Sequence, residues 1–162
     1  MAMKSLLVLY SYHHHNTEKI AKVFAKVLDA QIKAPQQINP EELQEYSLIG
    51  FGSGIYDDKH HKILLALGGI LPHVTNRKAF IFSTCGAFSD AHAYARKCHT
   101  LLREKLQSKG YVIVGEFNCA GFNTNSFLKL FGGLNKGRPN AEDLKHAEEF
   151  ACLLYTSPSP RD

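Results

Sequence analysis

The stretch LLVLYSYHHHNTEKIAKVFAKVL, residues 6–28, carries the clearest structural signal in the sequence. It begins with the apolar run Leu6–Leu9, which is typical of a strand buried on both faces of a parallel sheet. From Thr17 onward the apolar residues recur at helical spacing, which predicts an amphipathic helix with one buried side. A strand followed by a short polar loop and a helix indicates the beginning of an α/β fold.

The same alternation of strand and helix continues to residue 152. Apolar runs predict four further strands, at 31–33, 47–51, 79–82 and 111–114. Helical spacing and capping residues predict helices that begin near residues 40, 59, 89 and 140. Strands that alternate with helices in this way predict a three-layer α/β sandwich with right-handed crossovers.

Composition limits the possible classes of protein. The chain has 162 residues, of which 44% are hydrophobic and 21% charged, as is ordinary for one globular domain. No apolar run reaches the roughly 18 residues of a membrane span, and the start lacks a signal-peptide pattern. The four cysteines include no C-x-x-C pair, which argues against a disulfide scaffold or a zinc site and favours the reducing cytoplasm. The net charge of +4 is scattered along the chain, so a nucleic-acid surface is not supported.

The ending LLYTSPSPRD differs from the rest of the chain. We expect one domain over residues 1–152 and an unstructured tail over residues 153–162 that is not native sequence. This tail resembles the read-through peptides that sequencing adapters leave on assembled genes, and we assign it no function.

The loops that follow the strands are the expected place for a ligand, because ligands of doubly wound sheets bind outside the carboxyl ends of the strands. The first of these loops, residues 11–17, leads into a helix N-terminus, whose free N–H groups and partial positive charge suit a phosphate. Ser11, Asn16 and Thr17 add polar side chains to it. The loop has neither the pattern G-x-x-x-x-G-K nor G-x-G-x-x-G, so a nucleoside-triphosphate or dinucleotide site is not expected there.

Four segments, taken in order, resemble the flavodoxin family, which binds flavin mononucleotide (FMN). The first is S-x-x-x-x-N-T-E-K-I-A at residues 11–21, which resembles the phosphate loop of the family. It is one residue longer than usual and has histidines where threonine and glycine usually stand. The others are G-S-G-I-Y at 52–56, S-T-C-G at 83–86 and the closing helix GRPNAEDLKHAEEFA at 137–151. The resemblance covers residues 4 to about 152 and implies a flavodoxin-like doubly wound five-stranded parallel sheet, of order 2-1-3-4-5, with helices on both faces.

The resemblance also implies the residues of an FMN site. In the family the first loop holds the phosphate, an aromatic residue of the second packs on the flavin ring, and the third flanks the other side. Tyr56 is the expected stacking residue, and Phe88 either covers the opposite face or anchors the start of a helix. The residues expected to contact FMN are Ser11, Tyr12, His13, His14, His15, Asn16, Thr17, Ser53, Gly54, Ile55, Tyr56, Asp57, Thr84, Cys85, Gly86 and Phe88.

The histidine run His13–His15 has three interpretations. Adjacent residues of a short loop cannot all face one metal ion without strain, and no carboxylate or cysteine partner is obvious nearby. We therefore expect no metal site and favour phosphate binding by the loop as a whole. An exposed loop that is rich in histidine by chance remains the plainest alternative.

Other polar residues near the expected site have plain interpretations as well. Cys85 and Cys119 are expected to be small buried side chains rather than redox groups. His60 and His61 are expected to begin a helix beside the ring site. We expect both to be solvated unless they pair with the acidic residues Asp57–Asp58.

Three functions are open for an FMN-binding fold of this kind. The favoured one is electron transfer by a carrier that meets redox partner proteins in transient encounters. The first alternative is an FMN-dependent NAD(P)H oxidoreductase that reduces quinones or other acceptors, and the second is a nonredox binding module that has lost FMN. A net charge of +4 argues against a standard carrier, because such carriers are usually acidic. The absence of a second nucleotide motif argues against a reductase, and the oligomeric state stays open.

Overall fold

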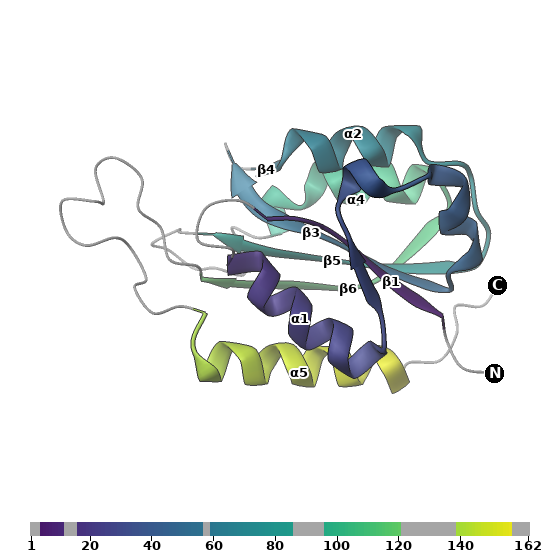
Figure 1. The fold of residues 1–162 in the computed structure, drawn as a ribbon. Coiled ribbons are helices and arrows are strands. Elements are labelled where there is room, and N and C mark those ends of the chain that lie inside the picture. The colour runs from purple at the N-terminus through teal and green to yellow at the C-terminus, as the bar shows by residue number, and fades with distance from the viewer. Residues whose placement is uncertain (1–3, 12–15, 57–58, 86–95, 121–138, 157–162) are drawn as a thin grey trace.

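A parallel sheet with strand order β2-β1-β3-β5-β6 forms the centre of the molecule. The computed structural model describes residues 4–11, 16–56, 59–85, 96–120 and 139–156 (Figure 1). The strands are β1 (Ser5–Tyr10), β2 (Gln31–Lys33), β3 (Leu48–Tyr56), β4 (Lys59–His60), β5 (Arg77–Cys85) and β6 (Tyr111–Ala120). The short β4 pairs antiparallel with the end of β3 and lies outside the parallel path.

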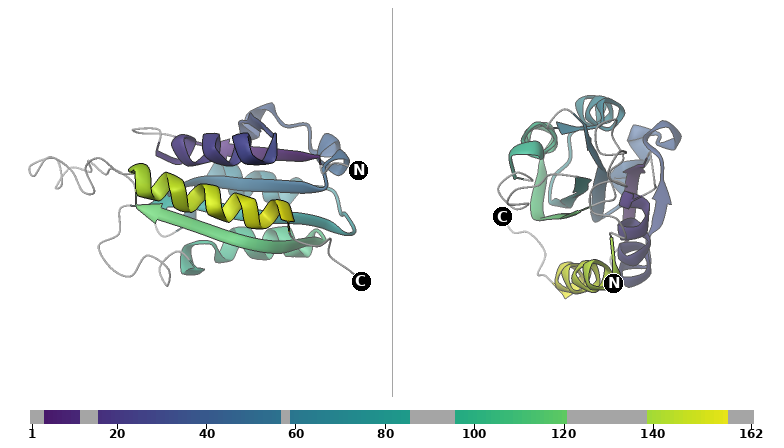
Figure 2. Two further views of the ribbon diagram at one scale, coloured as in Figure 1. Left: turned by 90° about the horizontal axis from the view of Figure 1, so that it is seen from below. Right: turned by 90° about the vertical axis from the view of Figure 1, so that its left-hand side faces the viewer.

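Helices cover both faces of the sheet. α1 and α5 lie on one face and α2 and α4 on the other (Figures 1 and 2). Their bounds are α1 (Asn16–Leu28), α2 (Lys62–Ile70), α4 (Thr100–Ser108) and α5 (Ala141–Thr156), with short 3-10 helices at Pro35–Gln37 and Pro40–Glu45. Because β5 and β6 are the fourth and fifth strands of the parallel path, the predicted doubly wound sheet of order 2-1-3-4-5 is confirmed. None of the helices in the described residues is long and apolar enough to cross a membrane.

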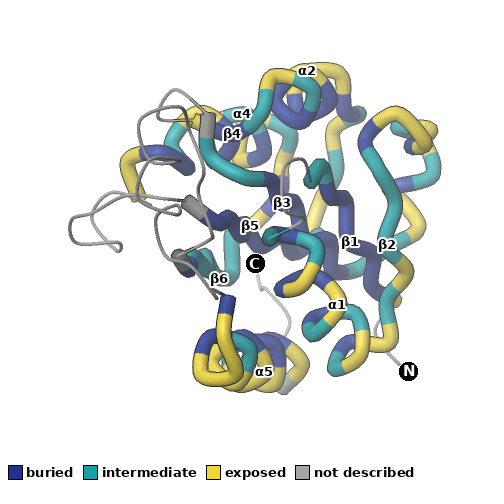
Figure 3. The backbone as a smooth tube through the Cα atoms, turned by 60° about the vertical axis from the view of Figure 1, so that its left-hand side comes forward, coloured by how far each residue is buried: buried dark blue, intermediate teal, exposed yellow. Residues whose placement is uncertain are grey.

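Alternate residues of the strands point to opposite faces and build two separate cores. On the α1/α5 face, Phe80 and Phe82 of β5 pack edge-on against Phe24 of α1. On the α2/α4 face, Phe51 and Ile81 pack among leucines of α2 and α4. Figure 3 shows the result, in which buried strands lie between helices whose outer surfaces are exposed.

The end of β3 differs from the prediction. The third strand was expected to end at residue 51, whereas β3 continues to Tyr56 and turns back into β4. Pairing with β5 supports this extension, since Ser53 and Gly54 are still in register with residues of that strand. The helix predicted from residue 59 therefore begins only at Lys62, and the side chain of His61 caps its first turn.

The final helix begins where the sequence predicts. The Asn140 side chain accepts a hydrogen bond from the Asp143 N–H at 3.0 Å, and the Asp143 carboxylate accepts one from the Asn140 N–H at 2.8 Å. This reciprocal pair is a capping box, which satisfies two N–H groups of the helix start. α5 then continues to Thr156, and its Leu154 is buried, so the helix extends past the expected end at residue 152. Residues 157–162 of the expected tail lie outside the described part of the chain.

Candidate functional site at the carboxyl edge of the sheet

The carboxyl ends of the parallel strands meet at one edge of the sheet, on the left in Figure 1. Pairing register places four polar residues side by side across β1, β3, β5 and β6, namely Tyr10, Ser53, Ser83 and Asn118. Two positions earlier in their strands, Phe51 and Ile81 belong to the α2/α4 core. Because side chains alternate along a strand, this polar row lies on the α2/α4 face as well.

A group of hydroxyls lies at the same edge on the α1 side. Thr84, whose register partner is Gly54, is buried near the end of β5, and Thr17 is buried in the first turn of α1. Their Oγ1 atoms are 2.8 Å apart, so one hydroxyl donates to the other and one proton is left for a further acceptor. Ser11, which follows β1, has a buried Oγ that makes no hydrogen bond within the described part of the chain. Asn16 begins α1, whose first N–H groups have no acceptor inside the helix.

Ser53 is the centre of one set of hydrogen bonds in the polar row. Its side chain is fully buried at the end of β3. Its Oγ lies 2.7 Å from the Gly54 carbonyl oxygen and 2.8 Å from Nδ1 of His60. It also accepts a hydrogen bond from the His61 N–H at 3.2 Å. These contacts tie the end of β3 to β4 and to the start of α2.

Ser83 is the centre of a second set, on the neighbouring strand. Its Oγ lies 2.6 Å from Nε2 of His99, and the Asn118 side-chain amide donates to it at 2.8 Å. Nδ1 of His99 lies 2.9 Å from the Glu116 carboxylate. Arg103 of α4 donates to both oxygens of that carboxylate, at 2.8 and 2.9 Å. The second set therefore ends in a bidentate ion pair between Arg103 and Glu116, a geometry that arginine favours with carboxylates.

Charge is balanced inside this network. Burial alone would raise the pKa of Glu116, but hydrogen bonds from His99 and Arg103 outweigh it and lower the pKa from 4.5 to about 2. The hydrogen bond to Glu116 in turn raises the pKa of Arg103, so the pair is ionised at neutral pH. Burial, followed by repulsion from His99, lowers the pKa of His60 well below 6.5 although Glu116 opposes the change. The His60 ring is therefore neutral at pH 7.

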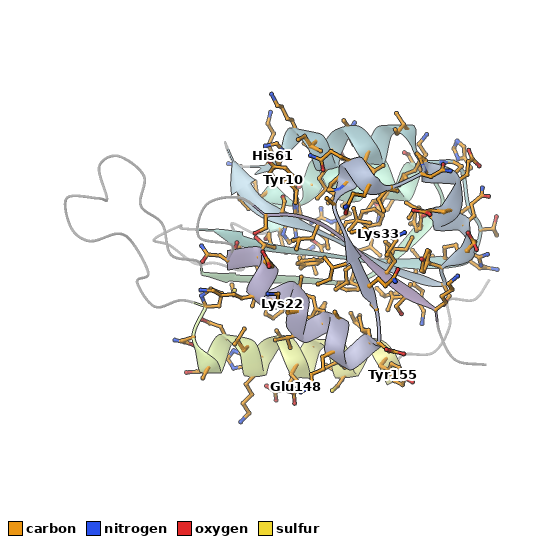
Figure 4. The ribbon with its side chains drawn as sticks, viewed as in Figure 1. Tyr10, Lys22, Lys33, His61, Glu148 and Tyr155 are labelled. Carbon is orange, nitrogen blue, oxygen red and sulfur yellow. The ribbon has the colours of Figure 1, made fainter. Side chains whose placement is uncertain are left out.

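An aromatic pair lies beside the polar row. The rings of Tyr10 and His61 are stacked, with centroids 4.0 Å apart and planes inclined by 21° (Figure 4). Burial, and then the nearby charge of Lys62, lowers the pKa of His61. The pair joins the end of β1 to the start of α2 through a largely neutral contact.

The structure places part of the predicted site along this edge. The predicted residues that lie there are Ser11, Asn16, Thr17, Ser53, Gly54, Ile55 and Thr84. Those outside the described part of the chain are Tyr12, His13, His14, His15, Asp57, Gly86 and Phe88, and the side chains of Tyr56 and Cys85 are outside it too. Their contact with a cofactor stays a prediction. Within the described ranges, no group of three or more His, Cys, Asp or Glu side chains is placed to hold a metal ion.

One interpretation of the sequence is wrong. His60 was expected to be a solvated residue at the start of a helix, but it lies in β4 and is 1% exposed. Sequence reasoning also missed His99, Glu116 and Arg103. A signal for them existed, because Ser83, Glu116 and Asn118 are polar residues that follow the apolar Ile81 and Ile113 on the α2/α4 face of β5 and β6. Cys119, by contrast, is buried as expected.

Comparison with known proteins adds to this geometry. A profile of the flavodoxin domain matches residues 7–152. The uncharacterized protein MJ0298 of Methanocaldococcus jannaschii is 49% identical over 149 residues, which cover 92% of this chain and 96% of that protein.

Solved structures of other proteins are similar in fold, and two of them serve as examples. Oxidised flavodoxin 1 of Bacillus cereus has a TM-score of 0.67 at 20% identity, over 96% of this chain and all (100%) of that one. An NADH:FMN oxidoreductase in its apo form has a TM-score of 0.58 at 18% identity, over 96% of this chain and 91% of that one. At such low identity these two similarities concern the fold, whereas the domain profile covers nearly the whole chain. The protein therefore belongs to the flavodoxin family.

Proposed function

We propose that this protein binds FMN at the carboxyl edge of its sheet and takes part in electron transfer. The observation that carries the proposal is the group of hydroxyls at the start of α1. Ser11 has a buried Oγ with no partner in the described residues, and Thr17 and Thr84 share one spare hydroxyl proton. A phosphate oxygen is an acceptor for these protons, and the helix N-terminus adds N–H donors and partial positive charge. The residues present therefore fit the phosphate of FMN, the ligand that family membership suggests.

The ends of β3 and β5 fit a flat ring beside that phosphate. Gly54 and Thr84 are register partners, so the chain segments that follow them begin side by side at the same edge. Two adjacent segments of this kind can enclose the two faces of a planar group and exclude water from it. Tyr56 and Phe88 remain our candidates for the faces of the ring. FMN, when bound, supplies the redox chemistry, and the chain supplies position and shielding.

We favour a carrier over a reductase. The net charge of the chain indicates the kind of partner that such a carrier would meet. With a net charge of +4, long-range attraction favours a partner that presents an acidic surface. Such an encounter would be transient and weakened by salt. The alternative, an FMN-dependent NAD(P)H oxidoreductase, draws support from the same unusual charge, because acidic surfaces are typical of carriers.

The test is the visible absorption spectrum of the purified protein after it is mixed with excess FMN and desalted. We expect flavin to remain bound, and desalted protein without flavin would contradict the proposal. NADH and then NADPH are added next, without oxygen. Slow or absent bleaching by both, with full bleaching by dithionite, is expected of a carrier. Rapid bleaching by either nucleotide would replace the carrier with the oxidoreductase.

A further inference from the structure

Two buried serine–histidine pairs lie at the same level of neighbouring strands. Ser53 of β3 and Ser83 of β5 are register partners, and each has its Oγ within 2.8 Å of a histidine nitrogen. His60 and His99 are each 1% exposed, and their ring centroids are 4.9 Å apart with planes inclined by 37°. Each serine directly precedes a residue of the proposed FMN site, Gly54 after the first and Thr84 after the second.

The protons of the first pair can be assigned from its distances. The Ser53 hydroxyl has a single proton, and the Gly54 carbonyl oxygen, 2.7 Å away, has none. Two oxygens at this distance attract only if a proton lies between them, so the hydroxyl donates to the carbonyl. The contact of 2.8 Å between Ser53 Oγ and His60 Nδ1 then requires the proton to be on Nδ1. The His61 N–H donates to the same oxygen at 3.2 Å, which fills its acceptor capacity.

This assignment also describes the rest of the His60 ring. A neutral imidazole with its proton on Nδ1 has an unprotonated Nε2. That nitrogen is buried and has no hydrogen-bond partner within the described residues. An unpaired buried acceptor is unfavourable, so Nε2 does not explain why a histidine occupies this position. The contact that favours a histidine at this position is the donation from Nδ1 to Ser53.

The second pair supports the first. A His99 ring with a proton on Nδ1 satisfies both of its side-chain contacts, because Nδ1 donates to Glu116 and Nε2 accepts from the Ser83 hydroxyl. Arg103 holds the Glu116 carboxylate from α4. The His99 ring is therefore fixed on both sides, and it packs against His60.

We propose that His60 is a positioning residue of the cofactor site, which acts through Ser53 to fix the direction of the Gly54 carbonyl. This inference rests on the proposed function, since it assigns Gly54 to the wall of the FMN site. With His60 as donor, the Ser53 hydroxyl points to the carbonyl and the peptide after Gly54 keeps one orientation. Without that donor, the Ser53 hydroxyl is no longer held toward the Gly54 carbonyl, and the peptide after Gly54 is held by strand pairing alone.

Two variants of similar size distinguish the role of Nδ1 of His60 from the role of Nε2. In His60→Asn the side-chain amide lies where Nδ1 was and can still donate to Ser53. In His60→Gln the amide lies near the former Nε2 and the donation is lost. FMN affinity is measured by the quenching of flavin fluorescence. We expect the Asn variant to bind FMN within about twofold of the unaltered protein, and the Gln variant about tenfold more weakly, a change of about 1.4 kcal/mol. Equal affinities of the two variants would overturn the proposal.

A measurement on the protein without FMN tests the positioning itself. Long-range ¹H–¹⁵N NMR of the imidazole rings reports which nitrogen carries the proton. We expect the Nδ1–H form for His60 at neutral pH, and backbone amide shifts at Gly54 and Ile55 that move in His60→Gln but not in His60→Asn. An Nε2–H form, or equal shifts in both variants, would overturn the inference. Failure of the unaltered protein to bind FMN would instead contradict the proposed function and leave this NMR result to decide the role of His60.

Discussion

The two faces of the sheet use the same strands for different purposes. On the α1/α5 face the inward residues away from the carboxyl edge are apolar, and aromatic rings pack edge-on in the core. On the α2/α4 face the inward residues are mostly aliphatic, and toward the carboxyl edge they give way to buried serine and histidine and to half-buried glutamate and arginine. Buried polar groups are unfavourable unless they are hydrogen-bonded, so the side chains on this face are held in a specific hydrogen-bond geometry. We infer that the aromatic core between the sheet and α1 and α5 supplies most of the stability, and that the hydrogen-bonded residues of the second face hold the ends of β3 and β5 at the site.

The sharpest test of this difference is Phe24→Ala on the aromatic face. The Phe24 ring lies within 5.7 Å, centroid to centroid, of four other rings, those of Phe80, Phe82, Phe117 and Phe150. We expect the free energy of unfolding, measured by urea denaturation, to fall by about 3–5 kcal/mol. The FMN dissociation constant of the remaining folded protein should stay unchanged. A large change in affinity with little loss of stability would show that the two faces are not separate in function.

Gly52→Ala tests how closely the aromatic face is packed against the sheet. The Phe82 ring lies directly over Gly52, and a Cβ there would overlap ring carbons. We expect a loss of about 1–3 kcal/mol in the free energy of unfolding, because a rigid ring and a central strand cannot move apart easily.

A double-mutant cycle gives the control for this substitution. In a Phe82→Leu background the same change at Gly52 should cost less, because the smaller side chain leaves room for the methyl group. Equal losses in the two backgrounds would contradict the contact between this glycine and the ring.

The polar face is expected to respond to pH through His60. Its pKa is lowered from 6.5 in the folded protein, so below that pH the unfolded chain binds a proton that the folded chain does not. The contribution of His60 to the free energy of unfolding should therefore be complete above pH 6.5. It should fall as the pH is lowered, by up to about 1.4 kcal/mol per pH unit. Urea denaturation at a series of pH values measures the slope.

His60→Asn is the matched variant, since asparagine does not titrate in this range. Its stability should fall less steeply than that of the unaltered protein as the pH drops below 6.5. The series stays above pH 4.5, because Glu116, with a pKa lowered from 4.5 to about 2, loses its own contribution below that value. Parallel slopes for the two proteins would mean that His60 is not buried in its neutral form.

The smallest effect is expected on the outer surface of α1. Lys22 lies 3.2 Å from Glu18 one turn earlier, and its side chain is 69% exposed (Figure 4). We expect Lys22→Ala to change the free energy of unfolding by no more than about 0.5 kcal/mol, because exposed ion pairs are screened by water and salt. Urea denaturation at low and high salt measures it. A loss comparable to that of Gly52→Ala would contradict the view that stability on this side comes from the buried face.

The sequence was sufficient for most of the fold because its signals are local. Apolar runs and helical spacing predicted the order of the elements, and the Asn140 cap was predicted as it stands. The extension of β3 was missed because Gly52 and Gly54 interrupt the apolar run, and pairing with β1, β4 and β5 keeps that segment in the sheet. Such pairing joins residues far apart in the chain, which a local pattern does not report.

The candidate site divides in the same way. Its place at the strand ends followed from topology, and Ser11, Thr17 and Thr84 lie where the hydroxyl-rich loops predicted. The contact between His60 and His99 depends on the register of β3 with β5 and on the turn into β4. No spacing within the sequence encodes that contact, so His60 was predicted to be a solvated residue at the start of a helix.

The most direct test of the central claim compares two serines at opposite ends of β1. Ser11 and Ser5 both have a buried Oγ without a partner in the described residues, but only Ser11 lies at the carboxyl edge. We expect Ser11→Ala to weaken FMN binding about ten- to a hundredfold, as loss of a hydrogen bond to a charged group does, and Ser5→Ala to leave it unchanged. Fluorescence titration of FMN with each variant gives the dissociation constants. Equal affinities for both variants and the unaltered protein would contradict a phosphate site at this edge.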